Sequence, residues 1–176
     1  MLTHIGTDTI ETERLILRRF EYSDADAMLK NWVADKKIQS LYSEPVYSTR
    51  EAVNELLDKY IGSYEKNDYY RWAIIEKKSG ECIGQIAYFL VDSKNHFAEI
   101  EYCIGSDFQC NGYATEATKA VIAYGFDKIN LHKIQICTKT INKPSKRVIE
   151  KCGFTYEGTL RDYFYMDGEY VGSVRN

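Results

Sequence analysis

The stretch that decides the fold reads AEIEYCIGSDFQCNGYATEA and runs from Ala98 to Ala117. Its first part belongs to a β-forming run that predicts a strand over residues 97–104. Its second part opens at Gly112 and continues as an Ala-rich run that predicts a helix to about Lys128. Apolar residues cover nearly all sides of this helix, and a helix of that kind lies against a sheet. The stretch therefore predicts a strand, a polar turn and a sheet-covering helix in direct succession.

Outside this stretch, apolar runs typical of strands alternate with segments whose apolar residues recur at helical spacing. A capping box at Ser48–Glu51 marks the start of the clearest helix, and the pair Asp167-Gly168 marks a hairpin turn. The predicted elements are a strand over 13–20, helices over 23–33 and 48–64, strands over 72–75, 82–90 and 132–138, a helix over 142–152 and a hairpin over 163–171. That order predicts the α+β class, with a mixed, mostly antiparallel central sheet flanked by helices.

The composition is that of a globular chain. Its 176 residues are one domain's worth, and 44% hydrophobic with 28% charged residues excludes a disordered or collagen-like chain. No apolar run approaches the ~20 residues that a membrane-spanning helix needs. The net charge is −3, whereas a dedicated nucleic-acid-binding domain is normally basic. We therefore expect one domain over residues 1–176, with neither a membrane nor a nucleic acid as its partner.

The cysteines and histidines indicate neither a disulfide scaffold nor a metal centre. The five cysteines form no C-x-x-C pair, and the three histidines lie far apart. Zinc sites need clustered ligands, so no metal is expected. Residues 1–4 lack the charged-then-apolar order of a secretory signal. We expect reduced thiols in a cytoplasmic protein.

The segment from Gln109 to Ala114 is a polar turn that opens a helix. The first amides of a helix have no intrahelical partner, and the helix dipole adds about half a positive charge there. Such a terminus attracts phosphate, and Gly112 lets the backbone approach an anion closely. From the residues alone, two interpretations stay open, a phosphate-binding turn and a plain loop.

Two glutamates lie in the strand that precedes this turn. Glu99 and Glu101 are two residues apart, so they share one face of the strand with Cys103. A carboxylate in a central strand is costly unless it is solvated, paired or used in chemistry. A partly dry site would suit a general base, and the alternative is a solvated face or a Lys or Arg partner.

The helix that begins at Asn142 carries a second set of candidate residues. Asn142 suits the N-cap position, and Ser145 lies on the apolar face of the helix. A hydroxyl placed there either bonds back to its own helix or faces a cleft. Lys143, Lys146 and Arg147 make the helix start positive, which would attract phosphate or simply be a solvated face.

Together these segments resemble the GNAT superfamily of acetyl-CoA-dependent N-acetyltransferases, in particular its RimJ/RimL-like branch. The resemblance covers nearly the whole chain and is most specific in 98–105, in 109–117, in Asn142 with Ser145, and in 148–154. It implies a GNAT-like acyl-CoA N-acyltransferase fold and direct transfer of an acetyl group from acetyl-CoA to a primary amine, without a metal. The acceptor would be a protein N-terminus or a small amine, and a homodimer is a candidate assembly because similar proteins often form dimers.

The resemblance also implies roles for individual residues. Glu99 or Glu101 would take the proton of the acceptor ammonium, directly or through water, and Ser145 would return a proton to the departing thiolate. The pantetheine arm would pair with the strand end, and the turn would wrap the pyrophosphate with its amides. The implied cofactor contacts are Tyr102, Cys103, Ile104, Gln109, Cys110, Asn111, Gly112, Tyr113, Ala114, Thr115, Asn142, Ser145 and Arg147.

Two positions depart from the family pattern. Glu101 stands where relatives commonly carry Gly, and Asn111 replaces a frequent basic residue of the turn. Cys103 and Cys110 are poorly suited to act as covalent nucleophiles, because neither has a His nearby in the sequence. The alternative function is a catalytically silent acyl-CoA-binding sensor or partner module, which would keep the cofactor site without turnover.

Overall fold

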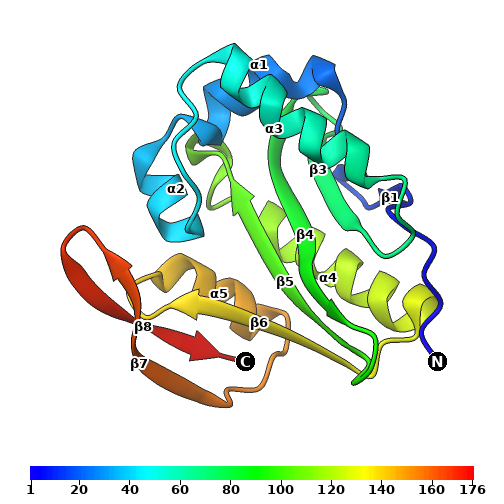
Figure 1. The fold of residues 1–176 in the computed structure, drawn as a ribbon, viewed down its shortest axis with the longest axis vertical. Coiled ribbons are helices and arrows are strands. Elements are labelled where there is room, and N and C mark those ends of the chain that lie inside the picture. Colours follow the sequence, from blue (N-terminus) through cyan, green and yellow to red (C-terminus); the bar gives the residue numbers. More distant parts are fainter.

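The computed structural model describes all 176 residues, and its centre is an eight-stranded sheet in the order β1-β2-β3-β4-β5-β6-β8-β7 (Figure 1). All neighbouring strands are antiparallel except β5 and β6, which are parallel. The strands are β1 (Ile10–Glu11), β2 (Leu15–Arg18), β3 (Tyr70–Glu76), β4 (Cys82–Asp92), β5 (Phe97–Ile104), β6 (Lys133–Lys139), β7 (Gly158–Met166) and β8 (Glu169–Arg175). The predicted mixed, mostly antiparallel α+β sheet is thus confirmed.

Five α-helices flank the sheet. A 3₁₀ turn and a π-helical stretch adjoin α1 on either side, and α4 continues into a second π-helical stretch over Gly125–Ile129. The helices are α1 (Ala25–Met28), α2 (Lys36–Tyr42), α3 (Arg50–Ser63), α4 (Tyr113–Tyr124) and α5 (Lys143–Lys151). Of these, α2 is not among the predicted elements.

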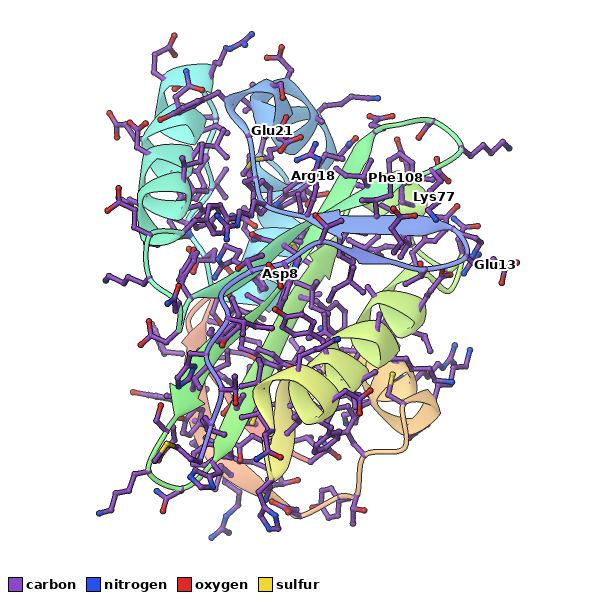
Figure 2. The ribbon with its side chains drawn as sticks, turned by 90° about the vertical axis from the view of Figure 1, so that its right-hand side faces the viewer. Asp8, Glu13, Arg18, Glu21, Lys77 and Phe108 are labelled. Atoms are coloured by element: carbon purple, nitrogen blue, oxygen red, sulfur yellow. The ribbon has the colours of Figure 1, made fainter.

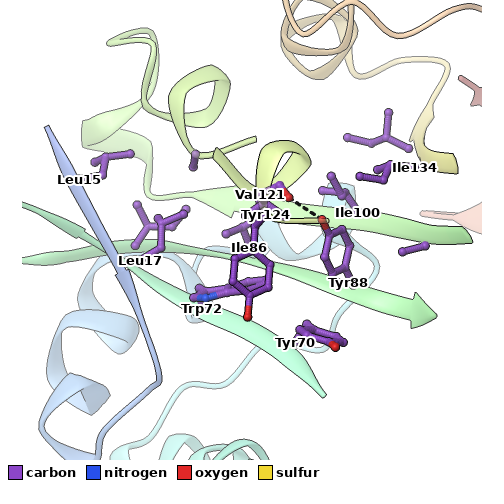
Figure 3. Close-up of a cluster of buried hydrophobic side chains, with 14 of the residues drawn as sticks. Leu15, Leu17, Tyr70, Trp72, Ile86, Tyr88, Ile100, Val121, Tyr124 and Ile134 are labelled. Carbon is purple, nitrogen blue, oxygen red and sulfur yellow. Dashed lines mark hydrogen bonds between the residues drawn. The ribbon is translucent and has the colours of Figure 1, made fainter. Parts of the chain in front are cut away.

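The core on one face of the sheet lies under α4 and α5. Val121 and Tyr124 of α4 pack on strand residues such as Leu17 and Trp72, and the Tyr88 hydroxyl donates a hydrogen bond to the Val121 carbonyl (Figure 3). Burial of such side chains stabilises the fold by about 1.5–3 kcal/mol each. The wide apolar arc of α4 is therefore explained by its position against the sheet.

The core on the opposite face lies under α1 and α3. In α3, the four residues Val53, Leu56, Leu57 and Tyr60 recur at helical spacing and are buried. They form a cluster with Ala73 and other residues from the strands. The amphipathic pattern of α3 was predicted, and the sheet supplies the surface that it covers.

Two predicted helix starts are wrong in detail. The N-cap of α3 is Thr49, whose hydroxyl accepts a hydrogen bond from the Ala52 backbone N–H at 3.2 Å, and not Ser48. The first helical turn begins at Tyr22, just before the predicted Ser23, and the Asp24 carboxylate accepts the Glu21 backbone N–H at 2.8 Å. In both cases a neighbouring residue has the extended backbone that an N-cap requires.

The strands β5 and β6 run side by side only at their beginnings. Their parallel pairing covers Phe97–Ile100 against Lys133–Ile136, and from Cys137 onward β6 pairs with β8 instead. Figure 1 shows the two strands moving apart beyond that point. We call this divergence the fork, and its arms are residues 101–104 of β5 and 137–139 of β6.

None of the helices has the length and the apolar content that crossing a membrane would require.

Candidate active site

The β5 arm of the fork presents backbone groups of a strand edge. The Gly105 N–H donates to the Ile83 carbonyl at 2.8 Å, and bonded pairs alternate along an antiparallel ladder. It is therefore the backbone of Cys103 that pairs with β4. The N–H and C=O groups of Tyr102 and Ile104 point the other way, toward the fork. Of the three residues predicted to pair with a pantetheine arm, Tyr102 and Ile104 present their backbone to the fork, whereas the Cys103 backbone is already paired with β4.

The turn after β5 has the backbone geometry expected of an anion-binding terminus. Gly112 has a φ of +82° and precedes α4 as its N-cap, with no side chain capping the helix. That positive φ is cheap only for glycine. The first backbone amides of α4, beginning at Tyr113, therefore have neither an intrahelical partner nor a capping side chain. Ala114 and Thr115 complete the first turn and are half-buried.

Two side chains of the turn donate hydrogen bonds to backbone carbonyls in and next to the turn. Gln109 Nε2 donates to the Ile104 carbonyl at 2.9 Å, and Asn111 Nδ2 donates to the carbonyls of Phe108 and Gln109 at 3.2 Å. Gln109, Cys110, Asn111 and Gly112 are exposed. The predicted contact residues are thus brought together, and the side chains of Gln109 and Asn111 shape the loop while its amides stay available.

Arg14, from the N-terminal part of the chain, contacts the same turn. Arg14 Nη1 donates to the Asn111 carbonyl at 2.9 Å, and its guanidinium lies 4.7 Å from the ring centre of Tyr113. Arg14 is also paired with Glu116 in the first turn of α4 at 2.7 Å. Tyr113 in turn donates a hydrogen bond to the Glu76 carboxylate. A positive charge therefore lies beside Asn111, although the sequence has no basic residue at that position.

The start of α5 lies across from β5 on the α4 side of the sheet. The Asn142 side chain caps α5 by accepting the Ser145 N–H at 3.2 Å, as predicted. The Tyr102 hydroxyl donates to Ser145 Oγ at 3.0 Å, so the Ser145 hydroxyl faces β5. Burial raises the pKa of Tyr102 to about 12, which keeps its proton in place at neutral pH. Arg147 is exposed on the same helix.

Glu99 lies at the base of the fork and is nearly enclosed. Its side chain is 8% exposed and accepts a hydrogen bond from Gln135 Nε2 at 2.6 Å. Arg175 of β8 lies 3.6 Å away and supplies a compensating charge. Burial, followed by the influence of the neighbouring Glu99 carboxylate, raises the pKa of Cys137 to about 12.

Glu101 lies on the β5 arm itself. It accepts a hydrogen bond from the Tyr42 hydroxyl at 2.7 Å and forms an ion pair with Arg71 Nη2 at 2.6 Å. Its side chain is more exposed than that of Glu99, at 22%. Glu99 and Glu101 share the sheet face covered by α1 and α3, as predicted, and each has an arginine partner.

The helix α2 connects the two arms on this face. From α2, Tyr42 contacts Glu101 on the β5 arm. On the β6 arm, the buried ammonium of Lys139 donates to the Ser40 carbonyl and to Ser43 Oγ, both at 2.5 Å. Burial lowers the pKa of Lys139, and the carbonyls at the end of α2 satisfy its donors. The fork is thus bordered by α2 on one face of the sheet and by α5 on the other.

The cysteines are poorly placed for covalent catalysis. Cys103 is buried, and burial raises the pKa of its thiol to about 12, which disfavours the thiolate that a nucleophile needs. Cys110 is exposed in the turn at a φ of +64°. The His4 side chain hydrogen-bonds to Tyr70 and to Ser93, at 3.1 Å each, and not to either cysteine. No group of three His, Cys, Asp or Glu residues is arranged to hold a metal ion.

A polar hollow of about 280 Å³ lies outside this region. Asp8, Arg18 and Glu21 line it together with three neighbours, and Figure 2 shows these three residues around the end of β2. Arg18 is already paired with Asp24 at 2.7 Å. Because none of the predicted site residues reaches this hollow, it does not compete with the fork as the candidate site.

Three residues of the site were not predicted from the sequence. Arg71, Tyr42 and Lys139 lie on three separate elements and converge only in the folded chain. The signal for Arg71 was present, since it is a charged residue within an apolar run ending at Ile75. Charged residues are rarely buried without a partner, so a partner was to be expected.

Known proteins of one family are similar to this chain. The sequence profile of the acetyltransferase (GNAT) domain matches residues 14–155. An N-acetyltransferase of Bacillus subtilis (strain 168) named YoaA is 33% identical over 159 residues, which are 90% of this chain and 89% of that protein.

Two solved structures extend the comparison to the fold. A GNAT-family acetyltransferase from Bacillus anthracis superposes with a TM-score of 0.84 and 27% identity, covering 96% of each chain. A spermidine N-acetyltransferase from Vibrio cholerae, solved in complex with CoA and spermine, has a TM-score of 0.80 and 26% identity over 93% of this chain and 94% of that one.

Proposed function

This chain belongs to the acetyltransferase (GNAT) domain family and is an N-acetyltransferase, and we propose that the fork between β5 and β6 is where it transfers an acetyl group from acetyl-CoA to a primary amine. The observation that carries the proposal is the divergence of two parallel strands directly before an uncapped helix N-terminus. One feature offers a strand edge, and the other offers amides for a diphosphate.

The strand edge is suited to the pantetheine and thioester part of acetyl-CoA. The N–H groups of Tyr102 and Ile104 point into the fork, where a backbone donor can stabilise the oxyanion that develops on the thioester carbonyl. In other acyl-transfer enzymes one such donor contributes roughly 2.7–4 kcal/mol. The amides from Tyr113 onward would bind the pyrophosphate, with Arg14 supplying positive charge nearby.

Glu101 and Ser145 are the residues that we assign to proton transfer. Glu101 lies on the open arm and takes the proton of the acceptor ammonium, directly or through a water molecule. Ser145 accepts a hydrogen bond from the Tyr102 hydroxyl, which leaves its own O–H free to donate a proton to the departing thiolate, and solvent water then restores the Ser145 proton. Glu99 is enclosed between Gln135 of β6 and Arg175 of β8, so we assign it to holding these strands to β5 at the base of the fork.

The acceptor is a small primary amine or a protein N-terminus. The Vibrio cholerae relative carries spermidine in its name, so a polyamine is one acceptor class to be tested here. A protein N-terminus is the other, and both would enter on the α2 side of the fork, where Glu101 lies.

The test combines binding and turnover. Calorimetry with acetyl-CoA and with CoA should show saturable binding, and a thiol-release assay should show CoA formed only when an amine is added. Binding without amine-dependent release over a broad amine panel would favour the catalytically silent sensor. If neither acetyl-CoA nor CoA gives a heat of binding, the proposed site is refuted.

A further inference from the structure

Arg71 crosses the middle strand of three to reach Glu101. On the sheet, Arg71 of β3 lies opposite Ala87 of β4, and Ala87 lies opposite Glu101 of β5. Neighbouring strands are about 4.8 Å apart, so the side chain has to span roughly 10 Å. The small, buried Ala87 lets the long side chain pass over it, and Arg71 Nη2 comes within 2.6 Å of Glu101 Oε1.

The surroundings keep the guanidinium in that place. Arg71 Nη1 donates to Gln85 Oε1 at 2.9 Å, and the guanidinium carbon lies 4.5 Å from the ring centre of Tyr60. The Arg71 side chain is only 12% exposed. Ions that are mostly buried are screened far less than surface ions. The positive charge of Arg71 therefore stays beside the carboxylate that faces the fork.

The neighbouring carboxylates give no surplus of negative charge on the β5 strand. Glu99 has Arg175 as its cation, 3.6 Å away. Glu44 follows the end of α2, and partial desolvation of its carboxyl group, followed by repulsion from Glu101, raises its pKa, while Arg71 and Lys59 oppose this. Each of the two glutamates on β5 therefore has its own arginine.

We propose that Arg71 is a specificity-determining residue, which makes this enzyme select acceptors that carry no second positive charge near the reacting amine. The inference rests on the proposed function of the fork. A second ammonium would find the Glu101 carboxylate already neutralised and would be repelled by the guanidinium. An acceptor whose other end is neutral or anionic avoids that repulsion. Monoamines and amino-carboxylates are therefore favoured over diamines and polyamines.

Three acceptors of matched length isolate this effect. Pentylamine, 5-aminopentanoate and 1,5-diaminopentane differ only in whether the far end is neutral, negative or positive. In a thiol-release assay with acetyl-CoA, we expect kcat/KM for either of the first two to exceed that for the diamine by about tenfold or more. After Arg71→Gln, the unpaired Glu101 carboxylate should reverse the order, and Arg71→Lys should preserve it. Glu55→Gln is the control, because it removes an exposed carboxylate of α3 that pairs with neither Arg71 nor Glu101, and it should leave the ratio unchanged.

The ratio between acceptors is a readout that a merely structural role of Arg71 would not move. Equal use of the diamine by the unsubstituted enzyme would overturn the inference while leaving the proposed function intact. An unchanged ratio in Arg71→Gln, with near-ultraviolet circular dichroism showing a folded chain, would do the same. If Arg71→Gln does not fold, the order of the three acceptors with the unsubstituted enzyme decides alone. Absence of thiol release with every acceptor would overturn both the proposed function and this inference.

Discussion

Arg14 and Glu116 are 102 residues apart in the chain, yet their side chains meet in an ion pair at 2.7 Å. Glu116 also accepts hydrogen bonds from the Thr12 hydroxyl at 2.6 Å and from the Arg14 backbone N–H at 2.9 Å. The pair fastens the turn between β1 and β2 to the first turn of α4. The candidate pyrophosphate turn is therefore held by a part of the chain that lies far from it in the sequence.

Replacing Glu116 by Gln should lower the free energy of unfolding by about 1.5–3 kcal/mol at neutral pH. Burial acts to raise the pKa of Glu116, but the bonds from Thr12 and Arg14 outweigh it and lower the pKa below the ordinary 4.5. A lowered carboxyl pKa contributes stability that is complete above 4.5 and is lost as the pH falls through the folded-state pKa. Urea unfolding at several pH values should show the two proteins converging in acid. Glu13→Gln is the control, since Glu13 is exposed at the tip of the same turn (Figure 2).

Gly112→Ala should weaken both the fold and CoA binding. The φ of +82° is strained for any residue with a Cβ, at a cost of about 1–2 kcal/mol, and a Cβ there would lie 3.4 Å from Arg14 Nη2. A shift of the turn relieves the strained φ, so we expect the Kd for CoA to rise about tenfold or more in calorimetry. Gly80→Ala is the matched control: its φ is +71° with open space around it, in the turn between β3 and β4. A control that weakened CoA binding equally would assign the effect to stability.

Glu101→Gln and Glu99→Gln should differ strongly in turnover. Glu101 lies on the open arm, so its loss should reduce kcat/KM for the amine by about 10²-fold, the lower end of the effect of a general base. Glu99 is enclosed by Gln135 and Arg175, so its loss should change stability rather than chemistry. Steady-state kinetics with thermal unfolding of both variants makes the distinction. The reverse ranking would assign the proton transfer to Glu99.

Ser145→Ala should lower kcat while leaving KM for acetyl-CoA nearly unchanged. Only the departing thiolate needs the Ser145 proton, so the loss belongs to the transition state, and we expect about a 10²-fold decrease, the lower end of the effect of a general acid. Tyr102→Phe should have a smaller effect, because Tyr102 only orients Ser145. Since the pKa of Tyr102 is about 12, it keeps its proton up to about pH 10, and both proteins should show the same pH profile of kcat below that value. An alkaline limb that disappears in Tyr102→Phe would contradict this assignment.

Thr49→Ala should cost about 1 kcal/mol of stability, whereas Ser48→Ala should cost almost nothing. The Thr49 hydroxyl accepts the Ala52 N–H at the start of α3, and Ser48 has no such bond. Urea titrations of the two variants provide the measurement. A larger loss for Ser48→Ala would restore the capping box that the sequence suggests.

The sequence predicted best where the information is local. The strand of Glu99 and Glu101 was placed over 97–104, which are its observed bounds. Asn142 was predicted as the cap of α5, and it accepts the Ser145 N–H. Both predictions depend on residues within a few positions of each other. The choice between Ser48 and Thr49 failed because adjacent hydroxyls look alike until the backbone angles are known.

The unpredicted parts depend on contacts between distant segments. The start of the short helix α2 is marked mainly by Asp35, whose carboxylate accepts the N–H groups of Lys37 and Ile38. Its role becomes visible only when Tyr42 meets Glu101. The reach of Arg71 over Ala87 likewise depends on the register of three strands, which no local pattern specifies.

The single parallel joint between β5 and β6 has a consequence for the order of folding. Strands β3, β4 and β5 follow one another through short turns, whereas β5 meets β6 only after the connection through α4. Contacts that close longer loops form more slowly, so we expect the β3–β4–β5 meander to assemble before the joint. Trp72 of β3 belongs to this meander and is buried, so its fluorescence would report the earlier event. A chain that had regained this signal would still lack catalytic power until the joint had closed.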